Sequence, residues 1–295
     1  MENLRGSVLM VLAMAGFALE DMFIKRLTSG LPVGQIVILL GLGGALVFGA
    51  ITRAQGRRLW SRDLLARPVL LRNFGELTGT MGFVTAIALT PLSSASAILQ
   101  ATPLAVTLGA AVFLGEPVGW RRWSAILAGF AGVLMVIRPG LAGFEPASLF
   151  AVMAVVGLAI RDLATRAVPR AISSMQLSTY AFATLVPTGA LLLPFGAAPA
   201  MPEGAEIRAL ALALVCGLAA YYAIVAAMRV GEVAVVTPFR YTRLVFALII
   251  GVAVFEERPD VWTLVGAGVI VASGLYTLMR EARLGRRRGG ARETA

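Results

Sequence analysis

Two adjacent carboxylates, Glu20 and Asp21, stand in an apolar stretch that reads AMAGFALEDMFIKR at positions 13–26. A charge inside a bilayer is costly unless it is paired or hydrated, so each one needs a physical reason. Adjacent helical residues point about 100° apart, so only one of the two can face a given cavity fully. That carboxylate could contact a substrate amine or exchange a proton. The alternative is that both lie near the membrane surface and pair with Lys25, one helical turn after Asp21.

A second polar stretch reads TPFRYTR at positions 237–243. Arg240 and Arg243 share one helix face, and Tyr241 lies between them in the sequence. Pro238 removes a helical hydrogen bond and bends the helix beside the arginines. A bend next to guanidinium groups is typical of a site for a substrate carboxylate. In the alternative interpretation, the arginines extend to the cytoplasmic surface or serve an inner gate.

Two more charged groups are expected inside the membrane. Glu76 follows Arg72 by one helical turn, which favours an ion pair, although a gate or proton site near a cavity floor is the functional alternative. Arg161 and Asp162 are adjacent, with Arg166 one turn later, and this pattern favours a local cluster of ion pairs. We include Glu76 among the candidate substrate-binding or coupling residues.

Uncharged side chains complete the candidate site. Thr80 and Phe83 continue inward along the same helix as Glu76. Tyr221 could stack on an apolar part of a substrate or simply fill the bundle. Gln100 and Pro103 form a smaller polar and bent feature in another apolar segment.

The composition indicates a membrane protein. Of the 295 residues 58% are hydrophobic, the mean hydropathy is +0.84, and only 14% are charged, whereas soluble proteins have about 25% charged residues. The apolar runs are continuous rather than alternating, which predicts helices and not a β-barrel. The chain has no histidine and a single cysteine, Cys216, so we expect no metal site, no disulfide within the chain and no cofactor.

Ten apolar segments are long enough to cross a bilayer, which needs about 20 residues. They are 7–27, 33–52, 69–89, 93–114, 120–137, 147–165, 176–195, 207–228, 233–255 and 261–279. The net charge of +10 falls mostly in loops that alternate with these segments and in the tail. Basic loops stay in the cytoplasm, so we expect both termini there, with contact to anionic lipid and no binding of nucleic acid.

The two halves of the chain resemble each other at one constant shift. A displacement of 141 positions places Gly16 on Gly157, Asp21 on Asp162, Lys25 on Arg166, Gln35 on Gln176 and Glu116 on Glu257. Matches at one spacing indicate an internal duplication. Five spans in each half force the second half into the membrane upside down. We therefore predict an all-α membrane protein built from two inverted five-helix repeats, 1–141 and 142–280, followed by a basic cytoplasmic tail at 281–295.

Each half ends in a helix, a short acidic turn and another helix. The turns read FLGEP at 113–117 and FEERP at 255–259, and the small-residue run at 125–132 and the Ala-Leu before Pro91 belong to the same pattern. In these features the chain resembles the EamA family of the drug/metabolite transporter superfamily. Among its branches the chain is most similar to amino acid exporters of the aromatic amino acid exporter type. The resemblance implies ten helices, a central cavity and export of small metabolites across the bacterial inner membrane.

The sequence thus predicts a secondary transporter that exports small metabolites, foremost amino acids, by alternating access. It leaves open the substrate and the choice between proton coupling and facilitated diffusion, and it is compatible with a monomer. One rival is efflux of drugs or cations by proton antiport. A second, from another class, is an intramembrane aspartyl protease in which Asp21 and Asp162 share a proton. A channel or a purely structural role is a third.

Overall fold

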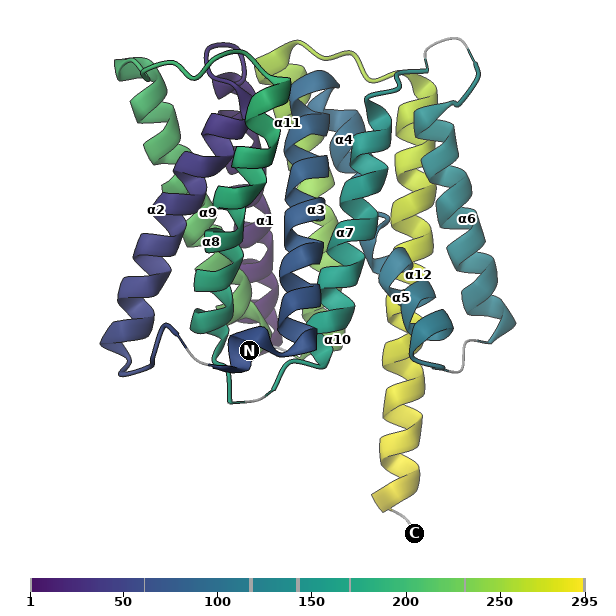
Figure 1. Ribbon diagram of the computed structural model, residues 1–295. Coiled ribbons are helices and arrows are strands. Elements are labelled where there is room, and N and C mark those ends of the chain that lie inside the picture. The colour runs from purple at the N-terminus through teal and green to yellow at the C-terminus, as the bar shows by residue number, and fades with distance from the viewer. Residues whose placement is uncertain are drawn as a thin grey trace.

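A computed structural model of the chain is a bundle of helices that run between two ends (Figure 1). It describes residues 2–60, 62–116, 119–141, 144–169, 171–230 and 232–293. The N-terminus and the end of the last helix lie at the same end of the bundle (Figure 1). We call this the terminal end and the opposite one the far end. The side chains of the predicted basic tail, 281–295, lie outside the described part, so their role stays a prediction.

The described residues form helices and no strands, which confirms the predicted all-α class. In chain order the elements are α1 (Glu2–Leu27), α2 (Val33–Ala54), η1 (Arg62–Leu65), α3 (Arg67–Leu89), α4 (Leu92–Leu99), α5 (Thr102–Phe113), α6 (Trp120–Ile137), α7 (Ser148–Arg166), α8 (Ser174–Leu192), η2 (Leu193–Phe195), α9 (Gly204–Val230), α10 (Val233–Val236), η3 (Thr237–Tyr241), α11 (Thr242–Phe255) and α12 (Val261–Glu293).

These elements match the ten predicted spans. Nine segments of the described chain are long and apolar enough to cross a membrane. Helix α3 is the tenth; it has 23 residues but is less apolar because it carries Arg72 and Glu76. The predicted spans 93–114 and 233–255 are not continuous. The first is split into α4 and α5, and the second into α10, η3 and α11.

The break between α4 and α5 has a local cause. Pro103 has no N–H, so it cannot donate to the carbonyl of Leu99 as a helical residue would. The hydroxyl of Thr102 donates to that carbonyl instead, at 2.6 Å. In the other broken span Pro238 occupies the first turn of η3. Both breaks therefore follow from a proline inside an apolar run.

Glycines set the packing of the long helices, which lie in the pairs α1 with α9, α2 with α8, α3 with α7 and α6 with α12. A methyl group on Gly75 would lie 2.7 Å from the carbonyl oxygen of Gly157, and one on Gly132 would lie 2.8 Å from that of Gly266. Small residues let helix backbones approach this closely, which replaces the hydrophobic driving force that lipid does not supply.

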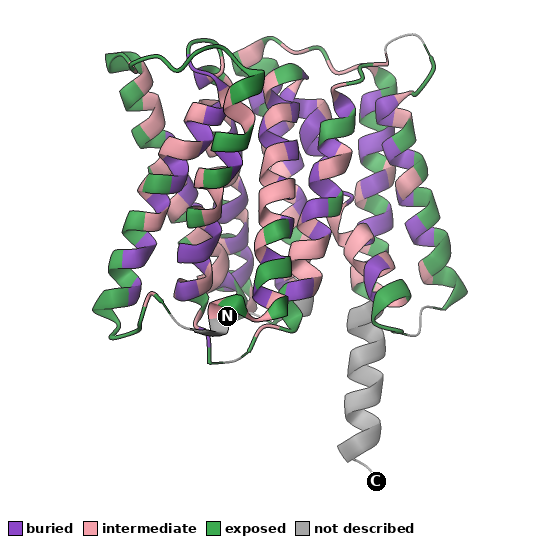
Figure 2. Cartoon of the chain, in the orientation of Figure 1, coloured by how far each residue is buried: buried purple, intermediate pink, exposed green. Residues whose placement is uncertain are grey.

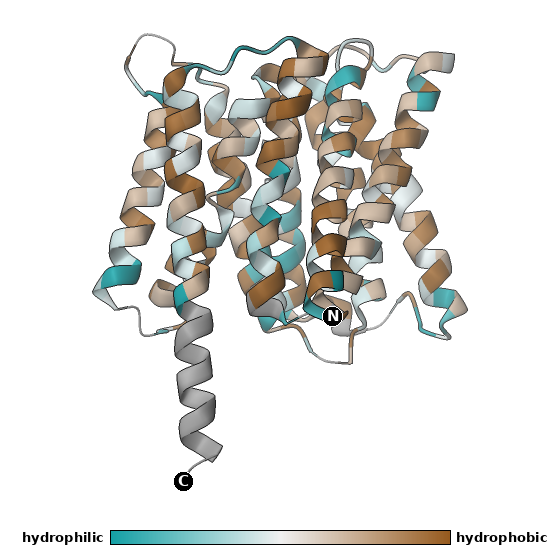
Figure 3. Ribbon diagram, turned by 180° about the vertical axis from the view of Figure 1, so that it is seen from behind, coloured by the Kyte–Doolittle hydropathy of each residue, from teal (hydrophilic) through white to brown (hydrophobic). Residues whose placement is uncertain are grey.

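The outer surface of the bundle is apolar. Buried residues face the interior, while exposed residues cover the outward faces of the helices (Figure 2). Large exposed apolar side chains include Leu46, Leu134, Val215 and Ile249. Figure 3 shows brown apolar residues along the outer helices, with hydrophilic residues in the loops and among the central helices. This distribution is expected where lipid surrounds the bundle and polar groups are kept inside.

Candidate functional site

Asp21 of α1 is held by Arg243 of α11. One terminal nitrogen of the guanidinium donates to both carboxylate oxygens, at 2.9 and 2.7 Å, and Nε donates to Oδ2 at 3.2 Å. The rings of Phe17 and Phe83 each lie 5.3 Å from the guanidinium carbon. Asp21 is only 3% exposed. Its charge is therefore compensated inside the bundle, and Phe83 contacts the arginine that compensates it.

Lys25 does not pair with Asp21, so that alternative is wrong. Its ammonium group donates to the carbonyl oxygens of Ile87 (3.0 Å) and Thr90 (2.6 Å), and it lies 3.6 Å from a carboxylate oxygen of Glu257. These partners are at the far end of the bundle, where α3 ends and α11 gives way to a turn. The interaction links the two halves of the chain.

Glu20 points to a different helix from Asp21, as the 100° separation predicts. A methyl group on Gly217 of α9 would lie 2.5 Å from its carboxylate oxygen, so the carboxylate occupies the space that this glycine leaves. Glu20 is half-buried. Within the described residues its carboxylate makes no hydrogen bond and no ion pair.

Arg240 lies in η3, where the two broken spans meet. The side-chain amide of Gln100, at the break between α4 and α5, donates to the backbone carbonyls of Arg240 (3.4 Å) and Tyr241 (3.3 Å). The guanidinium of Arg240 is half-buried and lies within electrostatic range of Asp162, Arg161, Arg243 and Tyr241. It makes no hydrogen bond or ion pair with any described residue. It is thus a cation inside the bundle that has no direct partner in the part of the chain that the structure describes.

Tyr241, which lies between Arg240 and Arg243 in the 237–243 stretch, points toward α12. It is 6% exposed, and its hydroxyl has no hydrogen-bond partner in the described part of the chain. The hydroxyl lies where a side chain on Gly274 would be. Tyr241 therefore packs the bundle beside the break rather than pairing with a neighbouring side chain.

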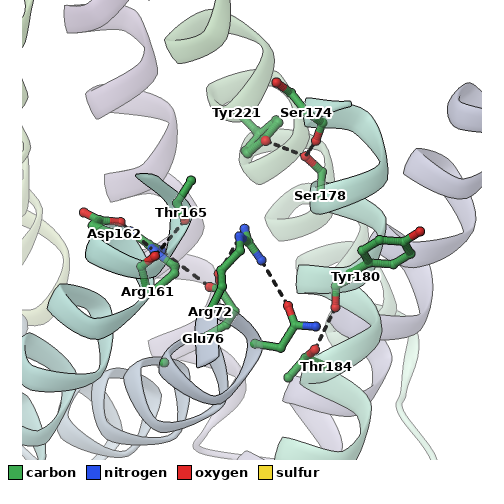
Figure 4. Close-up of polar contacts among 12 residues, drawn as sticks. Arg72, Glu76, Arg161, Asp162, Thr165, Ser174, Ser178, Tyr180, Thr184 and Tyr221 are labelled. Carbon is green, nitrogen blue, oxygen red and sulfur yellow. Dashed lines mark hydrogen bonds and ion pairs between the residues drawn. The ribbon is translucent and has the colours of Figure 1, made fainter. Parts of the chain in front are cut away.

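A charged cluster occupies the terminal half of the bundle, between α3 and α7 (Figure 4). The predicted pair of Arg72 and Glu76 is confirmed at 3.6 Å. Arg161 bonds Asp162 at 2.8 and 2.9 Å and lies 3.5 Å from Glu76. Arg166 was expected in this cluster but is not part of it, because it pairs with Glu116 at 3.1 Å. Asp162 and Asp21 thus bind separate arginines, which is not the arrangement of a shared-proton aspartyl dyad.

Tyr221 lies apart from the charges that surround Arg240. Its hydroxyl is hydrogen-bonded to that of Ser178 (Figure 4), and its ring meets that of Phe48 edge-on at 5.0 Å. It lines a cavity of about 340 Å³ between α2, α8 and α9, with Tyr222 beside it. Thr80, its equivalent in the first half, is half-buried on α3. The contacts of Tyr221 fit a side chain that fills the bundle.

The model of the EamA-like transporter family matches this chain twice, over residues 4–138 and 146–279. The chain belongs to the EamA-like transporter family. It is therefore a small-molecule transporter of the drug/metabolite type, embedded in a membrane by many helices. Since members of the family are transporters, membership points to a protein that is not an enzyme.

Relatives of known name carry different substrates. The chain is 28% identical to a riboflavin transporter of Vibrio cholerae, over 96% of each chain. It is 28% identical to the pseudopaline exporter CntI of Pseudomonas aeruginosa, over 93% of this chain and 96% of the relative. It is 26% identical to an S-adenosylmethionine uptake transporter of Rickettsia felis, over 72% and 71%. A crystal structure with 20% identity and a TM-score of 0.60 covers 94% of this chain and shares the fold.

Sequence reasoning missed the partners that lie across the two halves. It did not foresee Phe17 against Arg243, or the pairs Lys25 with Glu257 and Arg166 with Glu116. The sequence did contain a signal for these two pairs, because the 141-position shift places Lys25 on Arg166 and Glu116 on Glu257. Finding either pair would have predicted the second.

Proposed function

We propose that this transporter exports small zwitterionic metabolites, with amino acids as the foremost class, by alternating access through a site between the two halves of the bundle. The observation that carries the proposal is the pairing of charges inside the bundle. Asp21 and Arg243 neutralise each other, as do the arginines and carboxylates between α3 and α7. Glu20 and Arg240 remain without direct partners among the described residues.

An unpaired carboxylate and an unpaired guanidinium match the two charges of an amino acid. Glu20 would accept hydrogen bonds from the ammonium group, and Arg240 would bind the carboxylate. Both residues interact electrostatically with Arg243, and we propose that they bind the two ends of one substrate beside the Asp21–Arg243 pair. A charge left unpaired in a membrane interior is retained only where it serves a substrate or an ion.

Helix contacts support the inverted repeat that alternating access requires. Helix α1 packs along α9, and its equivalent α7 packs along α3, the equivalent of α9. The closest approaches correspond as well: a methyl group on Gly16 would lie 2.9 Å from the Cβ of Ala220, and one on Gly157 would meet Gly79. The shift of 141 positions turns the first contact into the second.

The centre of the bundle supports the same arrangement. Gln100 hydrogen-bonds the backbone of Tyr241, which is its own equivalent at a shift of 141 positions. A residue that contacts its own equivalent lies near the axis that exchanges the two halves. We accordingly propose 1–141 and 142–280 as the repeats, in line with the two matched ranges of the family model. Rocking of the halves about this axis would expose the site to each side in turn.

The loop charges support an inner-membrane orientation with the terminal end in the cytoplasm. The relatives named above include both an exporter and an uptake transporter, so they do not indicate the direction of transport. We propose export because the chain resembles amino acid exporters. The basic tail at 281–295 would then lie on the cytoplasmic side.

Counterflow in proteoliposomes tests the substrate class. Vesicles loaded with a panel of amino acids, amines and cationic drugs would be assayed for uptake of the labelled compound at two pH values. We expect saturable exchange with amino acids and weaker exchange with amines that lack a carboxylate. Exchange confined to cations and drugs would instead support efflux of the multidrug type. Flux that does not saturate would indicate a channel and overturn the proposal.

A further inference from the structure

Two ion pairs hold equivalent places in the two halves. Lys25 with Glu257, and Arg166 with Glu116, are related by the 141-position shift in both members. Each pair joins the end of the first helix of one half to the turn after the broken span of the other half. One pair lies at the far end of the bundle and the other at the terminal end. The chain therefore carries the same cross-link between its halves twice, once near each surface.

The two acidic turns have the same backbone arrangement at their glutamates. The residue before each glutamate has a left-handed backbone, with φ of 65° at Gly115 and 53° at Glu256. The backbone N–H of Glu116 donates to Ala110 at 3.2 Å, and that of Glu257 donates to the corresponding Gly251 at 2.9 Å. The first turn reads Gly-Glu-Pro at 115–117 and the second reads Glu-Glu-Arg-Pro at 256–259. In spite of this difference, the backbone at the glutamate is the same in both turns.

The surroundings of the two pairs differ. At the far end the side chains of Lys25 and Glu257 are 16% and 8% exposed. Glu257 also accepts hydrogen bonds from the first two amides of α4, at Leu92 (2.5 Å) and Ser93 (3.0 Å), and from the Ser93 hydroxyl (2.7 Å). Its charge thus lies at the positive end of a helix dipole, where carboxylates are stabilised.

At the terminal end the pair is far more open. Arg166 and Glu116 are 53% and 43% exposed and share a single contact of 3.1 Å. Exposed pairs of this kind contribute little to stability. Two equivalent ion pairs are expected to differ in exposure when a bundle with two conformations is closed at one end and less tightly packed at the other.

We propose that these pairs are the gate residues of the transport cycle, with Lys25 and Glu257 sealing the far end and Arg166 and Glu116 sealing the terminal end. In the conformation described here, the far-end gate is closed. Glu257 ties the turn after α11 to the start of α4 in the other half, while Lys25 ties it to α1 and to the end of α3. Opening the far end requires all these bonds to break together. This inference rests on the alternating access proposed above.

Thiol labelling tests the gate without any transported substrate. Ser96 is a suitable reporter because it is 2% exposed and lies one turn after Ser93 on α4. The assay uses Ser96→Cys in a Cys216→Ala background, in membrane vesicles of each orientation, with a membrane-impermeant thiol reagent. Adding Glu257→Gln should raise the rate of labelling from the far end by about tenfold or more, the factor that corresponds to about 1.4 kcal/mol.

The matched control is Glu116→Gln, which alters the equivalent residue of the exposed pair. It should not raise far-end labelling, because the far-end bonds remain intact and loss of the terminal-end pair favours the state that is open at that end. Lys25→Met should raise labelling less than Glu257→Gln does, since Glu257 still holds the start of α4. Equal labelling of the two glutamine variants would overturn the inference. So would unchanged labelling in Glu257→Gln when gel filtration shows it to be folded.

The two proposals fail separately. Normal amino acid counterflow together with unchanged far-end labelling would sink the gate and leave the proposed function standing. The expected labelling together with absent amino acid exchange would keep the gate and refute the substrate class.

Discussion

Replacing Arg243 with methionine should destabilise the bundle far more than the same change at Arg240. The guanidinium of Arg243 makes three hydrogen bonds to Asp21, which is 3% exposed. Removing one member of a buried ion pair costs about 3–5 kcal/mol because the other charge is left without compensation. At roughly 2 °C per kcal/mol for a chain of this size, the melting temperature should fall by about 6–10 °C.

Arg240→Met is the matched control, since it deletes the same group from the same segment. Because Arg240 has no direct partner among the described residues, its loss should shift melting by about 2 °C or less. The assay is thermal unfolding of the purified protein in detergent, followed by tryptophan fluorescence. The double variant Asp21→Asn with Arg243→Met should recover most of the lost stability, because it removes both charges. Equal melting of the two single variants would refute the reasoning.

Three further changes test other parts of the structure. Glu256→Gly should stabilise the protein by about 1 kcal/mol, because glycine adopts the left-handed backbone at φ 53° without strain; unchanged melting would count against that conformation. Gly157→Val should lower folded yield sharply, because its side chain would overlap α3; normal yield would contradict the helix pairing. Burial alone would raise the pKa of Asp260, but hydrogen bonds from Thr263 and the charge of Arg138 outweigh it and lower the pKa. The stabilising effect of this carboxylate should therefore be present above about pH 4 and be lost as pH falls further, so Asp260→Asn and the parent protein should differ in melting only above that range.

Much of the fold followed from the sequence because lipid leaves few options. Continuous apolar runs of about 20 residues predict membrane helices and their order whatever their neighbours are. The repeated pattern at a shift of 141 positions adds two inverted halves, which stay a prediction. The break in the first broken span was also signalled, by Pro103. The sequence did not show whether Pro103 bends the helix or interrupts it, because prolines do both in different helices.

The partners of the buried charges could not be read in the same way. Sequence spacing identifies neighbours one helical turn apart, and on that basis Lys25 was the alternative partner for Asp21. The true partner, Arg243, is 222 positions away. It becomes a neighbour only when α11 packs against α1. The local rule succeeded for Arg72 and Glu76, where the helix itself brings the partners together.

Counterflow of one amino acid and of its decarboxylated amine, in the parent protein and in Arg240→Ala, tests the central claim most directly. A lost hydrogen bond to a charged group corresponds to about 1.5–3 kcal/mol, or roughly tenfold or more in affinity. The account predicts that the parent protein prefers the amino acid by such a factor, and that Arg240→Ala loses this preference while still exchanging the amine. An undiminished preference in Arg240→Ala would contradict it.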